Sequence, residues 1–198
     1  MDAVLTCMVD EKIGPGEMNA RFIQSVKEFF KCDGAVAVRS PSIALKYAMK
    51  ALGAESGTTV MISALASSWQ ILALEEFGYT PLVLDVDEAT ALVTADIVSE
   101  GIKKGGRILL LHETNGIMPD MDAIASLGIP VIEDISQSVG SSAPVPEGTE
   151  RTPAEAARAR AGLYGVFAIL SLEERDVVTA GGGAVVMAGS RREWIPLK

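Results

Sequence analysis

Residues 107–134 form the stretch RILLLHETNGIMPDMDAIASLGIPVIED, which decides the fold class. Its two ends, 107–111 and 130–134, are near-continuous apolar runs, and the segment between them has a helical pattern over 120–127. Continuous apolar runs are typical of strands that helices cover on both faces. The stretch therefore predicts a strand, a helix and a second strand of a parallel sheet.

The same alternation extends on both sides of this stretch. Ser40 and Pro41 stand where the N-cap and first residue of a helix belong. We expect helices at 17–31, 41–52, 68–77 and 94–104, and strands at 35–38, 58–62 and 81–86. Two further apolar runs, 163–170 and 184–187, have no helix between them and predict a hairpin or an antiparallel edge. The predicted class is α/β, with three αβα layers around a mostly parallel, doubly wound sheet.

Composition excludes several classes of function. Among 198 residues, 17 Lys and Arg stand against 26 Asp and Glu, so the net charge is −9. An acidic surface repels phosphate backbones and anionic lipids, so we expect neither nucleic acid nor a membrane as partner. No apolar run reaches the about 18 residues of a membrane span. Two cysteines and one histidine cannot fill a zinc site, and they predict a reducing, cytoplasmic setting.

Ligands of open α/β sheets bind beyond the carboxyl ends of the strands. Four segments are expected there: 39–42, 63–69, 112–116 and 134–137. Asp134 at the end of its strand suits a ligand cation or a protonated ring nitrogen, or it caps a helix. Ser40 suits an anion such as phosphate, or it only caps its helix.

Two other residues of these segments have two interpretations each. Trp69 suits stacking on a ring, although tryptophan at helical spacing with apolar neighbours is more often part of the core. His112, the single histidine, suits a general base, although a packed and hydrogen-bonded histidine is commoner at a strand end.

Five stretches together resemble the DegT/DnrJ/EryC1/StrS family of sugar aminotransferases, from about Gly14 to Met187. They are IGPGEMNARFIQSVKEFF (13–30), VAVRSPSIALKYAMKALGA (36–54), FGYTPLVLDVD (77–87), PDMDAIASLGIPVIEDISQSVGS (119–141) and GGGAVVM (181–187). The resemblance implies the large domain of a fold-type-I pyridoxal-phosphate (PLP) enzyme. It also implies a homodimer with sites at the interface, and amino transfer from glutamate to a keto-sugar nucleotide.

The resemblance also implies roles for individual residues. Asp134 matches the aspartate that holds the protonated pyridine nitrogen of PLP, and Gln137 matches the glutamine near the ring hydroxyl. Ser40 and Ser42 fall on the phosphate-binding turn. Trp69 lies about two residues from the position of the ring-stacking aromatic residue.

The sequence departs from the family most sharply at the Schiff-base lysine. That position falls at about 173–175, near Glu174, and no lysine occurs between Lys104 and Lys198. Histidine, which replaces this lysine in the related sugar dehydratases, is absent there as well. Without an amine no covalent link to PLP forms at the usual place.

Three further departures affect the same pocket. Ala168 replaces the phosphate-contacting serine of its strand, and Pro41 replaces a glycine, which removes one N–H donor. The Gly-Glu-Gly-Gly turn has become Ala-Gly-Gly-Gly at 180–183.

We expect residues 1–198 to form one PLP-transferase-like large domain, with a loop or insertion at 141–160 and no small C-terminal domain. The chain ends at Lys198 as another element begins near Arg191, so it is either a natural short protein or a fragment.

Three hypotheses for its function follow. The chain is a catalytically impaired aminotransferase-like protein, a pseudoenzyme. Alternatively, it is a non-catalytic scaffold or partner subunit. Alternatively, it binds PLP, pyridoxamine phosphate (PMP) or a nucleotide sugar without a covalent bond, through the residues matched above.

Overall fold

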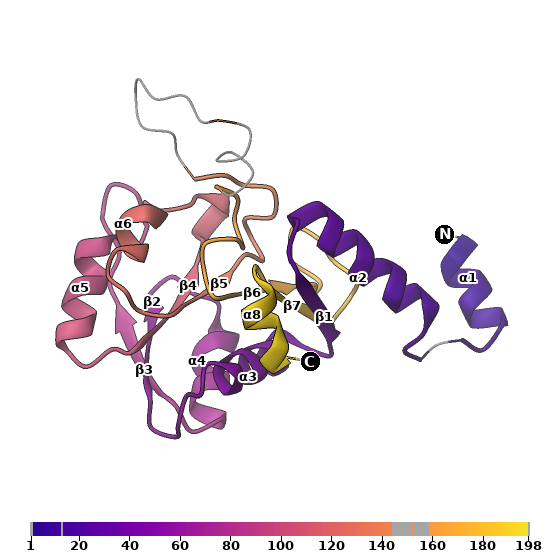
Figure 1. The fold of residues 1–198 in the computed structure, drawn as a ribbon, viewed down its shortest axis with the longest axis horizontal. Helices are drawn as coiled ribbons and strands as arrows, with labels where there is room; N and C mark the ends of the chain where they lie inside the picture. Colours follow the sequence, from indigo (N-terminus) through magenta and orange to yellow (C-terminus); the bar gives the residue numbers. More distant parts are fainter. Residues whose placement is uncertain (1, 13, 144–151, 153–158, 198) are drawn as a thin grey trace.

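A computed structural model describes residues 2–12, 14–143, 152 and 159–197. Its centre is a seven-stranded sheet in the order β1-β7-β6-β5-β4-β2-β3 (Figure 1). The strands are β1 (Gly34–Val38), β2 (Thr59–Ser63), β3 (Thr80–Leu84), β4 (Ile108–His112), β5 (Val131–Asp134), β6 (Phe167–Ser171) and β7 (Ala184–Ala188). The main helices are α1 (Asp2–Val9), α2 (Glu17–Phe30), α3 (Pro41–Ala51), α4 (Ser68–Glu76), α5 (Ala95–Lys103), α6 (Met121–Ala125) and α8 (Arg191–Trp194). Two 3-10 turns, η1 (Thr114–Gly116) and η2 (Ile195–Leu197), complete the described elements.

Helices cover both faces of the sheet and make three layers. In β4, Leu109 and Leu111 face a core with α2, α5 and α6, whereas Ile108 and Leu110 face a core with α3 and α4. Neighbouring side chains of a strand point to opposite faces of the sheet. Because helices cover both faces, every residue of β4 is buried. Each large aliphatic side chain buried in this way contributes about 1.5–3 kcal/mol to stability. The expected αβα class is confirmed.

The direction of the strands decides which loops meet. β2, β3, β4, β5 and β6 are parallel, β7 is antiparallel to β6, and β1 is antiparallel to β7. Among the described strands β7 alone is therefore reversed. The carboxyl ends of β1, β2, β4 and β5 consequently lie at one edge of the sheet, as the sequence predicted. The predicted hairpin between the last two strands is also confirmed.

Most element bounds agree with the sequence within a few residues, and three features differ. The first strand of the hairpin begins at Phe167 rather than 163, because 162–165 turn around the side chain of Glu133 instead. The predicted helix 120–127 is shorter, at Met121–Ala125. The sequence predicts no helix before residue 17, whereas α1 lies apart from the sheet and its covering helices (Figure 1). It buries none of its residues.

The predicted loop or insertion at 141–160 is described only at its ends. Ser142 pairs with Arg160 in an antiparallel bridge, and the Ala143 N–H donates to the carbonyl of Ala159. The two ends therefore lie side by side. The remainder of that prediction, at 144–151 and 153–158, falls outside the described residues.

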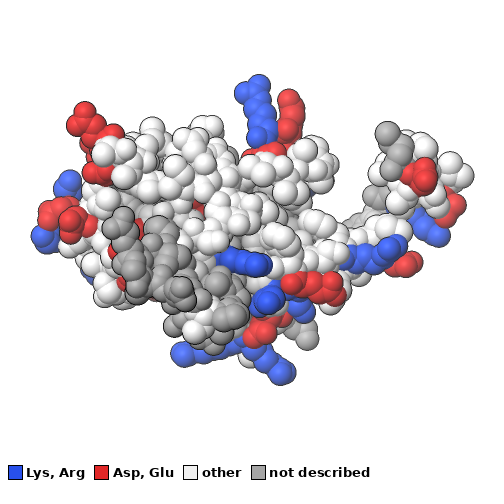
Figure 2. Space-filling view, turned by 90° about the horizontal axis from the view of Figure 1, so that it is seen from above, with Lys and Arg blue, Asp and Glu red and all other residues white. Residues whose placement is uncertain are grey.

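Charged side chains of both signs are interspersed around the rim of the face in Figure 2. Within the described ranges that face carries no extended patch of a single sign. Among the described helices, none has the length and apolar character needed to cross a bilayer.

Candidate functional site

The parallel pairing of β4 and β5 places His112 directly beside Asp134. Their side chains meet, with Nδ1 of His112 3.0 Å from Oδ2 of Asp134. Because a carboxylate only accepts hydrogen bonds, Nδ1 carries the proton in this contact. His112 is buried and hydrogen-bonded, as the interpretation of a packed histidine expects, and a role as a general base stays a prediction.

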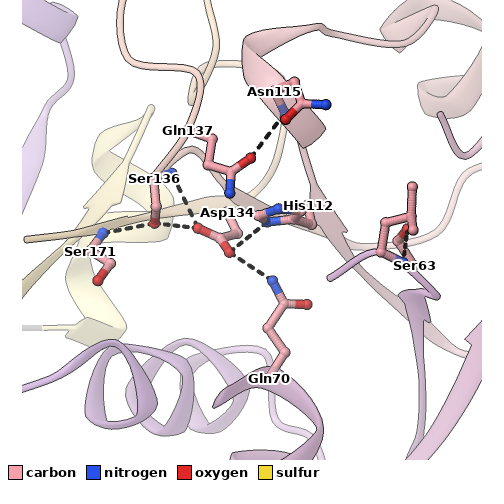
Figure 3. Close-up of polar contacts among 9 residues, drawn as sticks. Ser63, Gln70, His112, Asn115, Asp134, Ser136, Gln137 and Ser171 are labelled. Carbon is pink, nitrogen blue, oxygen red and sulfur yellow. Dashed lines mark hydrogen bonds and ion pairs between the residues drawn. The ribbon is translucent and has the colours of Figure 1, made fainter. Parts of the chain in front are cut away.

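The same carboxylate accepts three further hydrogen bonds (Figure 3). Nε2 of Gln70 donates to Oδ2 over 2.7 Å, from the first turn of α4. The backbone N–H and the hydroxyl of Ser136 both donate to Oδ1, over 3.2 and 2.5 Å. The Ser136 hydroxyl oxygen in turn accepts from the N–H of Ser171 in β6. Asp134 is therefore the centre of a network that joins β4, β5, β6 and α4.

The alternative of a helix cap does not describe Asp134. A turn follows β5 from residue 136, and the side chain bonds the chain two residues on instead. Asp134 and Gln70 both have 0% exposure. An ionised carboxylate offers about four acceptor positions, and four donors of this chain occupy them. Asp134 is a fully satisfied internal group.

Gln137 lies at the same edge of the sheet but is exposed. Its Oε1 accepts from the N–H of Asn115, which has a φ of 55° in the loop after β4. This contact ties the loops after β4 and β5 together (Figure 3). No hydrogen bond between Gln137 and Asp134 occurs among the described residues.

Ser40 is the N-cap of α3, and its hydroxyl oxygen accepts from the N–H of Ile43 over 3.3 Å. Pro41 is the first helical residue, as the sequence predicted. Ser42 is half-buried in the same turn. The geometry bears out the capping interpretation of Ser40, and a role of either serine toward phosphate stays a prediction.

Trp69 is half-buried and packs against the core on the α3 and α4 face. Its neighbour Gln70 reaches the site instead, a residue that the sequence analysis did not single out. A signal for it existed. Gln70 precedes the buried residues Ala73 and Leu74 by three and four positions, which places a polar side chain on the buried face of α4.

The segment expected to hold the lysine is a turn between β6 and β7. Glu173, Glu174 and Arg175 are exposed, and the N–H of Glu173 donates to a carboxylate oxygen of Asp176 over 2.7 Å. Ala168 is buried in β6 opposite Glu133. Thus none of the three residues at the lysine position is a buried nucleophile.

Two further carboxyl groups lie beside the Asp134 network: Glu133 precedes Asp134 in the chain, and Glu113 follows His112. The Glu133 carboxylate accepts from the N–H groups of Gly162, Tyr164 and Gly165. Gly165 is required there, because a Cβ at this position would lie 2.7 Å from the carbonyl oxygen of Val131. Burial raises the pKa of Glu133, and the three N–H donors oppose that rise.

Glu113, just after β4, is the other member of the pair. It has 0% exposure, and neither carboxyl oxygen has a hydrogen-bond partner of acceptable geometry within the described ranges. Burial, followed by the charge of Glu133, raises its pKa from 4.5 to about 10, and the nearby Ser138 hydroxyl offsets part of this rise. Glu113 therefore holds a proton at neutral pH.

No group of three or more potential metal ligands occurs among the described residues.

A seven-stranded, mostly parallel sheet between two helical layers, with an aspartate at the end of a central strand, is the architecture of the large domain of PLP-dependent transferases of fold type I. The chain belongs to the DegT/DnrJ/EryC1/StrS aminotransferase family, whose model matches residues 1–193.

Two curated relatives are similar to most of this chain. It is 27% identical over 164 residues to 3-amino-5-hydroxybenzoate synthase of Amycolatopsis mediterranei (strain S699), covering 80% of this chain and 39% of the relative. It is 24% identical over 180 residues to L-glutamine:2-deoxy-scyllo-inosose aminotransferase of Micromonospora echinospora, covering 89% and 40%.

A solved structure shares the fold over the whole chain. The aminotransferase from Psychrobacter cryohalolentis superposes with a TM-score of 0.82 at 23% identity, covering 99% of this chain and 48% of that protein. The chain spans about two fifths of the two curated relatives and about half of the solved structure.

Proposed function

We propose that this chain is a family member that does not carry out Schiff-base amino transfer through its own residues. The observation that carries this proposal is the absence of any lysine from 105 to 197, the range that includes the position of the family's catalytic lysine. A Schiff base requires a primary amine. The exposed carboxylates of Glu173 and Glu174 and the guanidinium of Arg175 supply none.

The residues that would hold PLP do not fit the cofactor as they stand. When bound, PLP supplies an electron sink for amino transfer. The carboxylate expected to hold its ring nitrogen, Asp134, is fully buried and has four internal donors. At the expected phosphate turn, Pro41 offers no N–H, and the Ser40 hydroxyl already caps α3. These contacts support an impaired site more than a retained one.

We further propose a non-catalytic subunit, working as a homodimer or with an active relative, as the function that replaces catalysis. Exposed apolar side chains favour it over the binding of PMP or a nucleotide sugar. Four of the eight residues of α1 are large, apolar and 55–82% exposed, and Phe29 on α2 is half exposed: Val4, Leu5, Met8, Val9 and Phe29. A short helix that exposes this many apolar side chains is a candidate interaction site. Two free cysteines, Cys7 and Cys32, support a cytoplasmic compartment.

Borohydride reduction in the presence of PLP tests the catalytic part of the proposal. We expect only scattered labelling of surface lysines that rises with PLP and does not saturate, as measured by peptide mass spectrometry. The variant Glu174→Lys places an amine at the matched position and controls for access to this turn. A stoichiometric adduct at one lysine of the wild type would contradict the proposal.

Sedimentation velocity tests the subunit part of the proposal. A dimer that Leu5→Asp and Met8→Asp convert to a monomer is the expected result. A concentration-independent wild-type monomer that captures no active relative when the two are mixed would overturn this part.

A further inference from the structure

The contact between Gln70 and Asp134 involves a residue to which the family resemblance assigned no role. The two residues are 64 positions apart, and both have 0% exposure. Helix α4 directs the Gln70 amide toward the sheet edge, where it meets Oδ2 of Asp134 (Figure 3). The 2.7 Å separation is typical of a hydrogen bond to a charged acceptor.

The orientation of the Gln70 amide is fixed by its partner. Only the NH₂ end can face a carboxylate, because the oxygen end would bring two acceptors together. Oε1 of Gln70 therefore points elsewhere, and it is buried without a hydrogen-bond partner within the described part of the chain. A buried acceptor left unpaired is unfavourable. Gln70 keeps this position although only one end of its amide is satisfied.

The other donors leave no second open position on the carboxylate. His112 occupies the remaining direction on Oδ2, and Ser136 occupies both directions on Oδ1. His112 and Ser136 approach from the same edge of the sheet as Asp134 itself, from the ends of β4 and β5. Gln70 alone among these donors comes from a helix, so it is the donor whose removal opens space beside Oδ2 without disturbing a strand.

We infer that Gln70 closes the Asp134 carboxylate to ligands with a protonated ring nitrogen, and that removing its side chain restores an open acceptor there. This inference rests on the proposed function. A chain that forms no covalent bond to PLP can bind a pyridine ring only through noncovalent contacts such as a hydrogen bond to Asp134. The ligand class is a phosphorylated aminomethyl-pyridine. A ring N–H and the Gln70 amide compete for the same lone pair of Oδ2.

Titration with PMP tests the inference. PMP carries an amine rather than an aldehyde and forms no Schiff base with lysine, so its result is independent of the borohydride experiment. We expect calorimetry to detect no saturable binding of PMP to the wild type. Gln70→Ala should bind PMP saturably, with a dissociation constant at least about tenfold below the highest PMP concentration that fails to saturate the wild type. The added substitution Asp134→Asn should abolish the gain. Gln24→Ala, which removes an exposed glutamine of α2, is the matched control and should behave as the wild type.

Three results of the titration would overturn the inference. They are saturable binding of PMP to the wild type that Asp134→Asn abolishes, a folded Gln70→Ala protein that binds no better than the wild type, and binding by Gln70→Ala that persists in the double variant. If Gln70→Ala does not fold, Gln70→Ser takes its place in the same comparison. In the wild type, the side-chain NH₂ of Gln70 should exchange slowly with solvent by NMR and lose this protection in Asp134→Asn. Fast exchange in the wild type would also contradict the inference.

Discussion

Asp134 and Glu113 are both completely buried at the carboxyl ends of neighbouring strands, yet their surroundings are opposite. Four donors surround Asp134, whereas the described residues supply no well-placed donor to Glu113. The pKa of Glu113 rises to about 10, chiefly through burial. The comparison teaches that two carboxyl groups with equal burial differ in the hydrogen-bond donors around them, and that a carboxyl group with few donors holds its proton more tightly.

The largest effect is expected from Asp134→Ala. Removing the carboxylate leaves the donors of Gln70, His112 and Ser136 buried without an acceptor, so the free energy of unfolding should fall by about 3–5 kcal/mol. Urea unfolding followed by circular dichroism measures the change. Asp33→Ala, at an exposed aspartate, should change stability by less than about 0.5 kcal/mol. A loss below about 1 kcal/mol for Asp134→Ala would show that the network contributes little.

The second prediction concerns Glu113 and pH. The folded-state pKa of Glu113, about 10, lies above the ordinary 4.5. The contribution of this group to stability is therefore complete below about pH 4.5, falls steadily as the pH rises, and is fully lost once the pH has passed through 10. For one proton the slope is at most about 1.4 kcal/mol per pH unit, or about 3 kcal/mol from pH 6 to 8. Glu113→Gln carries no proton to lose, so its unfolding free energy should be flatter across this range.

Urea unfolding at several pH values between 6 and 9 makes that comparison. The exposed Glu55→Gln variant serves as the control and should retain the wild-type slope. Equal slopes for the wild type and Glu113→Gln would mean that Glu113 is not the group that binds the proton.

A smaller effect is expected from Gln70→Ala. The lost hydrogen bond to Asp134 destabilises the fold, but the unpaired Oε1 disappears with it, so we expect a net loss of about 1–2 kcal/mol. Thermal and urea unfolding both measure it. A loss as large as that of Asp134→Ala would indicate that Gln70 supports the core of α4 rather than the carboxylate alone.

The smallest effect is expected from Ser40→Ala, which removes the N-cap of α3. The cost should be about 1 kcal/mol, which is typical of a lost cap. Ser42→Ala, one position beyond Pro41, is the matched control and should cost less than about 0.5 kcal/mol. Equal losses of unfolding free energy for the two variants would contradict the capping role that the structure gives to Ser40.

Much of the fold was predictable because its signals are local. Buried strands such as β4 (Ile108–His112) are visible in the sequence as apolar runs, and Ser40 followed by Pro41 marks the start of α3. The absence of lysine from 105 to 197 is likewise a property of the sequence alone. Helix α1 was not predictable in the same way, because it buries no face and therefore shows no clear pattern.

The sequence by itself determined the α/β alternation, the position of Asp134 at a strand end and the missing amine. Only the tertiary structure decided what surrounds Asp134, since the donors come from Gln70 and His112, 64 and 22 residues away. It also decided that Glu113 is buried without a well-placed donor. The physical reason is that helix and strand signals depend on neighbours along the chain. Hydrogen bonds between distant segments depend on how strands pair and helices pack, which no local pattern encodes.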